Sequence, residues 1–198
     1  MITIGTRPPK IKQANKRGNR FLLSTMACMF LYGIFLPVSW EDRFGPFGEF
    51  ITWTALTVPA AVKLAEVSPI PELVSGFVGL GAWVAPAFAL LFVSKDPIGE
   101  RVRFAFSRPG WPFLKTFGFL YLLACPAIMI GIWVAYFMPI TIDMTGGFTW
   151  GGKLLVSMIT DRFSLAFFGA IFTAGIGLLF WILIAYVVGP IVLMLNGD

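Results

Sequence analysis

The sequence predicts an all-α integral membrane protein with four transmembrane helices. Hydrophobic residues make up 58% of the 198 residues and charged residues 13%, with a mean hydropathy of +0.84. Soluble domains are about 45–50% apolar and about 25% charged, so a water-soluble fold of this composition would expose broad apolar surface. The apolar residues also form four long runs without Asp, Glu, Lys or Arg, as in a protein that crosses the bilayer repeatedly. We expect one polytopic domain over residues 21–198 and a basic arm over residues 1–20.

Six of the fifteen basic residues lie in the N-terminal arm: Arg7, Lys10, Lys12, Lys16, Arg17 and Arg20. No acidic residue precedes Glu41. The three charges nearest Phe21 are expected to hold this end of the chain in the cytoplasm. The three distal charges lie around Pro8-Pro9, which favours an extended segment. We expect Arg7, Lys10 and Lys12 to contact anionic lipid headgroups or an acidic surface of a partner subunit.

The first predicted span is Phe21–Ser39, which holds 19 residues without a charge. At about 1.5 Å per residue, it just covers a hydrocarbon core of about 30 Å. No small-x-small cleavage site follows Leu36, so we expect a membrane anchor rather than a cleaved signal peptide. The segment 51–67 is apolar for twelve residues and then carries Lys63 and Glu66, which predicts an interfacial or re-entrant segment.

The other three predicted spans are Leu73–Ser94, Thr116–Met138 and Ser164–Leu195. The first two of these contain 22 and 23 residues, enough for one crossing each. The last contains 32 residues, which is too long for one straight crossing. We expect it to tilt, to kink near Gly189-Pro190, or to begin outside the lipid.

The distribution of basic residues predicts that both chain ends lie in the cytoplasm. With four spans, the N-terminal arm, the loop 95–115 and the C-terminal tail share one side and carry eleven basic residues, whereas the other side carries four. Cytoplasmic loops are enriched in Lys and Arg. If 51–67 also crossed, the loop 95–115 and its five basic residues would lie outside. The charges therefore favour four spans, in what we expect to be a bacterial inner (plasma) membrane.

The loop 95–115 is predicted to form a short amphipathic helix. Asp96 is a suitable N-cap and Pro97 a suitable first helical residue. The basic side chains that follow, Arg101, Arg103 and Arg108, would then face anionic lipid headgroups at the cytoplasmic face. The alternative is that this loop docks a soluble partner.

Small residues recur at four-residue spacing in the second and fourth spans. In lipid, such positions let helix backbones approach closely. We expect helix packing, within the chain or against a neighbour, at eight of them: Ser75, Gly79, Gly81, Ala85, Ala170, Thr173, Ala174 and Gly177.

The sequence contains no histidine, and no predicted span contains Asp, Glu, Lys or Arg. Proton relays and ion pathways place ionisable groups inside the membrane, haem and most zinc sites rely on imidazole, and a Ser/His/Asp arrangement is excluded. Cys28 and Cys125 lie in apolar runs without an activating histidine. We therefore expect no enzymatic activity, cofactor or metal site. Nucleic acid is not an expected partner, because the basic residues flank apolar spans in two blocks.

These features favour a non-catalytic membrane subunit of a larger bacterial inner-membrane assembly, which acts by helix packing and by contacts with lipids and other membrane subunits. Two alternatives stay open on the sequence. One is a small pore, transport or translocation component for secretion or conjugation, whose lumen is lined by hydroxyls: Ser24, Thr25, Ser75, Thr173 and Tyr186. The other is a membrane immunity or exclusion protein that blocks a toxin or a conjugating partner.

Overall fold

The computed structural model describes residues 9–37, 45–93, 96–97, 99–100, 127–137 and 150–184. Within these residues the regular structure is helical throughout, which confirms the all-α fold class. The helices are α1 (Pro9–Phe35), α2 (Pro46–Leu56), α3 (Pro59–Glu66), α4 (Pro71–Val93), the helix Ala127–Phe137, α7 (Trp150–Thr160) and α8 (Arg162–Leu183).

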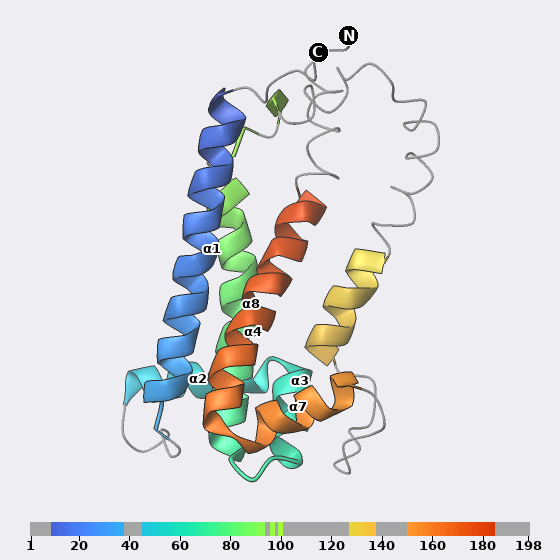
Figure 1. Cartoon of the computed structure of the whole chain (residues 1–198). Coiled ribbons are helices and arrows are strands. Elements are labelled where there is room, and N and C mark those ends of the chain that lie inside the picture. Colours follow the sequence, from blue (N-terminus) through green and yellow to red (C-terminus); the bar gives the residue numbers. More distant parts are fainter. Residues whose placement is uncertain are drawn as a thin grey trace.

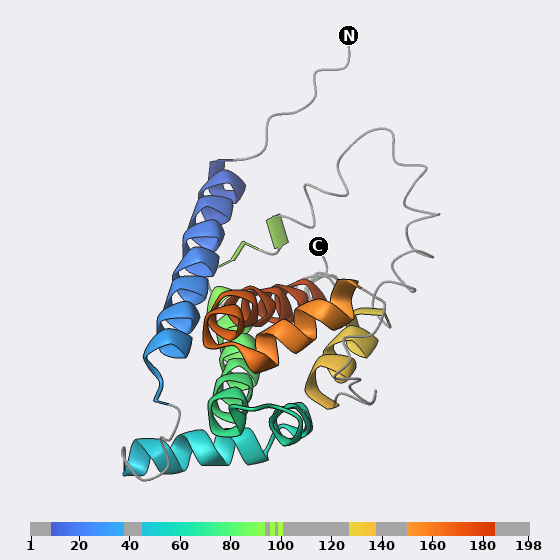
Figure 2. The same cartoon turned by 60° about the horizontal axis from the view of Figure 1, so that its bottom comes forward.

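Three long helices, α1, α4 and α8, stand side by side (Figure 1). As drawn there, α1 runs from the upper to the lower end, whereas α4 and α8 run from the lower to the upper end. The helix Ala127–Phe137 stands on the far side of α8 from α1 and runs downward like α1. The short helices α2, α3 and α7 lie across the lower end, and Figure 2 shows α2 crossing the foot of α4.

Two described helices, α4 and α8, are long and apolar enough to cross a membrane. They contain 23 and 22 residues, and at about 1.5 Å per residue each exceeds a hydrocarbon core of about 30 Å. They cover the second predicted span and the first part of the fourth. Residues 185–195 of the fourth span, including Gly189-Pro190, lie outside the described residues.

In the other two predicted spans, the uncharged stretch of described helix is shorter than this. Helix α1 ends at Phe35, four residues before the predicted end, so its uncharged part from Phe21 extends for about 22 Å. Of the third predicted span, the structure describes the helix Ala127–Phe137, and residues 116–126 lie outside the described residues. The described residues therefore support two of the four predicted crossings by length and composition.

Proline opens each of the first four helices, and at Pro9 this corrects one expectation. The extended conformation predicted around Pro8-Pro9 is wrong for Lys10 and Lys12, which lie in the first turn of α1. Proline has no backbone N–H, but the N–H groups of the first helical turn have no partner within the helix anyway, so proline begins a helix at little cost. Arg7 lies outside the described residues.

The segment 51–67 is divided between two short helices. Helix α2 contains 11 residues and α3 contains 8, and each is too short to cross a bilayer. Helix α2 stops because Pro59 cannot donate a hydrogen bond to the carbonyl of Ala55. Before α2, Gly45 has a φ of +49°, a backbone conformation that glycine adopts without strain.

The core lies where α1, α4 and α8 meet in the lower half of the bundle, and its centre is Phe77 of α4, which is 1% exposed. Glycines make the space for this ring. A Cβ on Gly33 of α1 would lie 2.8 Å from the ring, and a Cβ on Gly169 of α8 would lie closer still. One aromatic side chain therefore fills the space that two glycines leave open on the neighbouring helices.

Candidate functional site

The charged side chains within the described residues lie at the two ends of the bundle, with an uncharged band between them. The upper end carries five basic and two acidic residues, a net charge of +3: Lys10, Lys12, Lys16, Arg17, Arg20, Asp96 and Glu100. The lower end carries three basic and four acidic residues, a net charge of −1: Lys63, Lys153, Arg162, Glu49, Glu66, Glu72 and Asp161. The bundle therefore has a basic end and a mixed end.

An ion pair at the upper end joins the start of α1 to the segment that follows α4. The Lys10 ammonium donates to Glu100 Oε1 over 2.7 Å. This hydrogen bond and the nearby carboxylate charge raise the pKa of Lys10. The pair is exposed, so its contribution to stability is small, but it brings together two segments that the distribution of basic residues predicts to be cytoplasmic. Arg101, Arg103 and Arg108 lie outside the described residues.

The interface between α4 and α8 is closed by small residues. A Cβ on Gly81 would lie 2.7 Å from Thr173 Oγ1, and one on Gly177 would lie 3.3 Å from the Ala85 carbonyl oxygen. Ala170 and Ala174 are also buried, at 2% and 4% exposure. Of the eight residues expected at packing positions, four therefore meet in this seam, and Ala170 and Ala174 are buried beside it or elsewhere on α8.

The other two expected packing residues face the lower-end helices. A Cβ on Gly79 would lie 2.5 Å from Ala55 Cα in α2, so this glycine lets the α2 backbone cross directly over α4. Ser75 is half-buried beside the α2–α3 corner, and its hydroxyl donates to the Glu72 carbonyl over 2.9 Å.

Sequence reasoning missed the packing positions on α1 and one on α8. Thr25, Met29 and Gly33 are buried at four-residue spacing on α1, and Gly169 extends the α8 series by one more step. The signal was present, because Gly169, Thr173 and Gly177 are four residues apart. On α1 it was hidden, because the buried series includes the large side chain of Met29.

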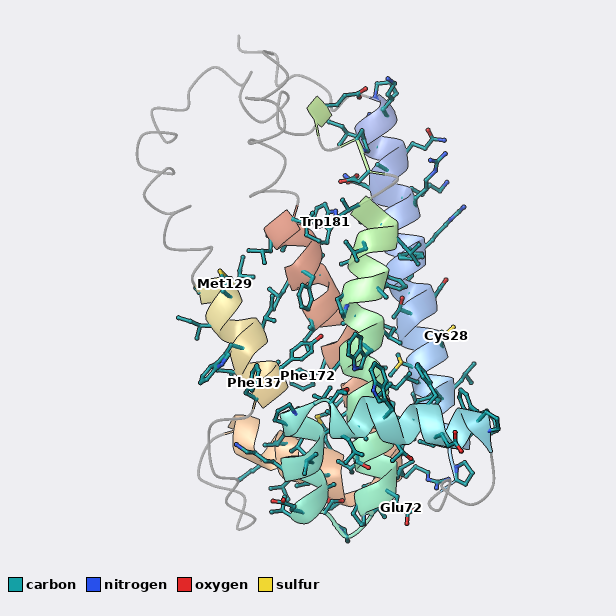
Figure 3. The ribbon with its side chains drawn as sticks, turned by 180° about the vertical axis from the view of Figure 1, so that it is seen from behind. Cys28, Glu72, Met129, Phe137, Phe172 and Trp181 are labelled. Carbon is teal, nitrogen blue, oxygen red and sulfur yellow. The ribbon has the colours of Figure 1, made fainter. Side chains whose placement is uncertain are left out.

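The described hydroxyls among those considered for a pore lumen have different surroundings. Thr25 and Thr173 are buried at 4% and 5% exposure in packed helix interfaces, and Thr25 donates to the Phe21 carbonyl over 3.1 Å. Ser24 is exposed and donates to the Arg20 carbonyl over 2.9 Å. Tyr186 lies outside the described residues. Cys28 is exposed on α1 and points away from the other helices (Figure 3).

Side-chain contacts tie the helices together at the lower end. Arg162 at the start of α8 donates to the Ile34 carbonyl of α1 over 3.3 Å, and Ser68 donates to the Ile159 carbonyl of α7 over 2.5 Å. Asp161 caps α8 by accepting a hydrogen bond from the Ser164 amide over 2.7 Å. This bond to the charged form lowers the pKa of Asp161.

The helix Ala127–Phe137 is held to α4 by a carbonyl that a proline leaves free. Pro86 lies inside α4 and has no N–H, so the Ala82 carbonyl has lost its donor four residues on. The Tyr136 hydroxyl donates to this carbonyl instead. Inside a bilayer a backbone carbonyl needs such a partner, because no water is present to supply one.

Beside this contact is an apolar pocket of about 500 Å³ between α4, α8 and the helix Ala127–Phe137. Figure 3 shows that helix beside α8, with Met129 and Phe137 labelled. Five aromatic side chains contribute to the wall: Trp83, Trp133, Tyr136, Phe137 and Phe180. This pocket was not anticipated from the sequence, because its residues come from segments far apart in the chain.

A row of exposed aromatic side chains on α2 continues toward this pocket. Phe50 stacks on Trp53 with ring centroids 6.1 Å apart, and Trp53 lies 5.1 Å from Trp83. Trp83 Nε1 donates to Thr57 Oγ1 over 2.9 Å. Tryptophan is enriched at the membrane–water interface, and this row contains one tryptophan on α2 and one on α4.

Among the residues that the structure describes, no three His, Cys, Asp or Glu side chains are grouped so that they could hold a metal ion. No protein-family model, no curated protein and no solved structure matches the chain.

Proposed function

We propose that the protein is a non-catalytic integral membrane subunit of a larger bacterial inner-membrane assembly, with four spans and both chain ends in the cytoplasm. The observation that carries the proposal is the uncharged band of the bundle, bounded by a basic end and a mixed end. A water-soluble bundle has no reason to gather its charges at its ends, whereas a bilayer requires it.

The directions of the helices support four crossings. Helix α1 and the helix Ala127–Phe137 run downward, and α4 and α8 run upward, as four successive crossings require. Helices α2, α3 and α7 belong to the connections between them, and all three lie at the lower end. In this arrangement α2 and α3 lie along the outer membrane surface.

The sign of the charge supports the orientation. The upper end has a net charge of +3 and the lower end −1 within the described residues. Cytoplasmic segments are enriched in Lys and Arg. The upper end, with the start of α1 and Glu100, is therefore the proposed cytoplasmic end.

The closed seam favours a contact function over a pore. Small residues bring α4 into direct contact with α8, which leaves no space between these two helices for a lumen. The outer face of α8 instead presents large apolar side chains, which include Phe163, Phe167 and Ile171 at 60%, 46% and 41% exposure. In the proposed assembly, this face packs against lipid and a neighbouring subunit.

Co-purification tests the subunit proposal. The tagged chain is extracted from alkaline-washed membranes in mild detergent, and the proteins that stay attached are identified. We expect stoichiometric membrane partners that survive gel filtration. Recovery of the chain alone, together with conductance in a planar bilayer, would favour the pore. A sole soluble toxin or conjugation partner would favour the immunity or exclusion protein.

The basic arm gives a second test of partner binding. Replacing Arg7, Lys10 and Lys12 with Gln should leave membrane insertion intact and weaken co-purification at low salt, and the difference from the wild type should shrink at high salt, because screening weakens the exposed charge contacts of the wild-type arm. Glu100→Gln is the control, since it removes the ion pair with Lys10 but keeps the charge of the arm. If the triple variant assembles normally, the arm does not bind a partner.

A further inference from the structure

The wall of the 500 Å³ pocket is mostly apolar, which favours an apolar ligand. Of the polar groups in the described wall, the Tyr136 hydroxyl donates to Ala82, and Thr57 accepts from Trp83 and donates to the Thr54 carbonyl over 2.9 Å. The remaining described wall residues, among them Ile132, are apolar apart from the indole N–H of Trp133, whose side chain is 49% exposed. The volume falls within the range of about 300–1,000 Å³ that small-molecule sites occupy. A hydrocarbon chain fits such a wall, because it has no group that needs a hydrogen-bond partner.

A positive charge stands at the lower rim of the pocket. The Lys63 ammonium donates to the carbonyl oxygen of Phe137 over 3.3 Å, and Phe137 is part of the wall. The chain leaves the wall at Val58 and enters α3, which carries Lys63. An exposed ammonium beside an apolar opening matches a ligand with an acidic head and an apolar tail.

We propose that this pocket binds one acyl chain of an anionic phospholipid, whose phosphate pairs with Lys63 at the lower membrane surface. The proposal rests on the membrane placement given under the proposed function, in which the lower end meets the lipid headgroups and the pocket lies within the hydrocarbon region. It adds a lipid site on the side of the membrane opposite to the basic arm. Lysine is a suitable partner because its ammonium attracts phosphate as a compact point charge.

Lipid retention measured by native mass spectrometry tests the proposal. The full chain is purified in mild detergent, mixed with phosphatidylglycerol or phosphatidylcholine, and the lipids that stay bound are counted. We expect one phosphatidylglycerol per chain. Lys63→Gln should weaken phosphatidylglycerol retention about fivefold, which is the factor expected for one charge beside a headgroup. Lys153→Gln is the matched control, since Lys153 is also exposed at the lower end but lies on α7, away from the contact that Lys63 makes with the wall residue Phe137, and it should change nothing.

A second variant tests the acyl-chain part. Ile132→Trp places a bulky ring in the wall and should weaken retention of both lipids, whereas Lys63→Gln should affect phosphatidylglycerol alone. Circular dichroism and gel filtration check the fold of each variant. If Ile132→Trp does not fold, the comparison of Lys63→Gln with Lys153→Gln tests the proposal instead. No lipid retained by the folded wild-type chain, equal loss in both lysine variants, or a second copy of the chain in place of lipid would overturn the proposal. A chain absent from alkaline-washed membranes would instead overturn the proposed membrane placement.

Discussion

At the scale of single residues, a proline in α4 explains how a neighbouring helix is attached. Pro86 takes away the hydrogen bond to the Ala82 carbonyl, and the Tyr136 hydroxyl replaces it. The proline and the tyrosine are therefore coupled, although 50 residues separate them in the chain. Neither residue alone predicts the contact, because proline and tyrosine are common in apolar runs.

A double-mutant cycle measures this coupling. Tyr136→Phe should destabilise the protein by about 0.6–1.7 kcal/mol, the range found for hydrogen bonds between helices in membranes. In a Pro86→Ala background the same change should cost close to nothing, since residue 86 then donates its own N–H to Ala82. The free energies are compared by unfolding in mixed micelles. Equal costs in both backgrounds would mean that Tyr136 does not act through the Ala82 carbonyl.

Asp161 predicts a dependence of stability on pH. Its pKa is lowered because its carboxylate accepts a hydrogen bond from Ser164 at the start of α8. A carboxyl group with a depressed pKa stabilises the folded state above its unfolded pKa of about 3.9, and this stabilisation is lost as the pH falls through the folded value. Asp161→Asn keeps the cap but does not titrate. The thermal midpoint of the wild type should therefore fall more than that of the variant between about pH 5 and pH 3.

At the scale of helices, glycine positions decide which elements touch. The approach of α2 to α4 depends on Gly79, where a Cβ would meet the α2 backbone. Gly175 on α8 is in a helix too, but a Cβ there would meet open space. These two positions allow packing to be separated from the general effect of glycine on helices.

Gly79→Ala should destabilise the protein by about 1–3 kcal/mol, because the added methyl group forces α2 away from α4. Gly175→Ala should be neutral or slightly stabilising, since alanine favours a helix and meets nothing. Thermal unfolding of the two purified variants provides the comparison. If both variants behaved alike, α2 would not be held against α4 at Gly79.

The sequence predicts the apolar helices better than the contacts between them. The runs beginning at Leu73 and Ser164 became α4 and α8, because uncharged stretches of this length have one stable conformation in lipid. The helical start of α1 was missed, since Pro9 was given the meaning it has inside a helix rather than in the first turn. The pocket beside Tyr136 depends on how distant segments meet. Such meetings leave no local pattern in the chain.

At the scale of the whole molecule, the two ends of the bundle have different proposed functions. The upper end combines the basic start of α1 with Glu100, and the lower end combines α2, α3 and α7 with the rim of the lipid pocket. The uncharged band joins them. This division has meaning only if the bilayer lies between the two ends, so topology is the claim on which the rest depends.

Cysteine accessibility in spheroplasts tests that claim most directly. In a background with Cys28 and Cys125 replaced by Ser, single cysteines are placed at Lys12 and Lys16 of the upper end and at Glu49 and Lys153 of the lower end, and a membrane-impermeant maleimide is added. We predict labelling at Glu49 and Lys153 on intact spheroplasts, and at Lys12 and Lys16 after permeabilisation alone. Labelling of all four positions without permeabilisation, or of Lys12 together with Lys153, would contradict a bilayer between the two ends.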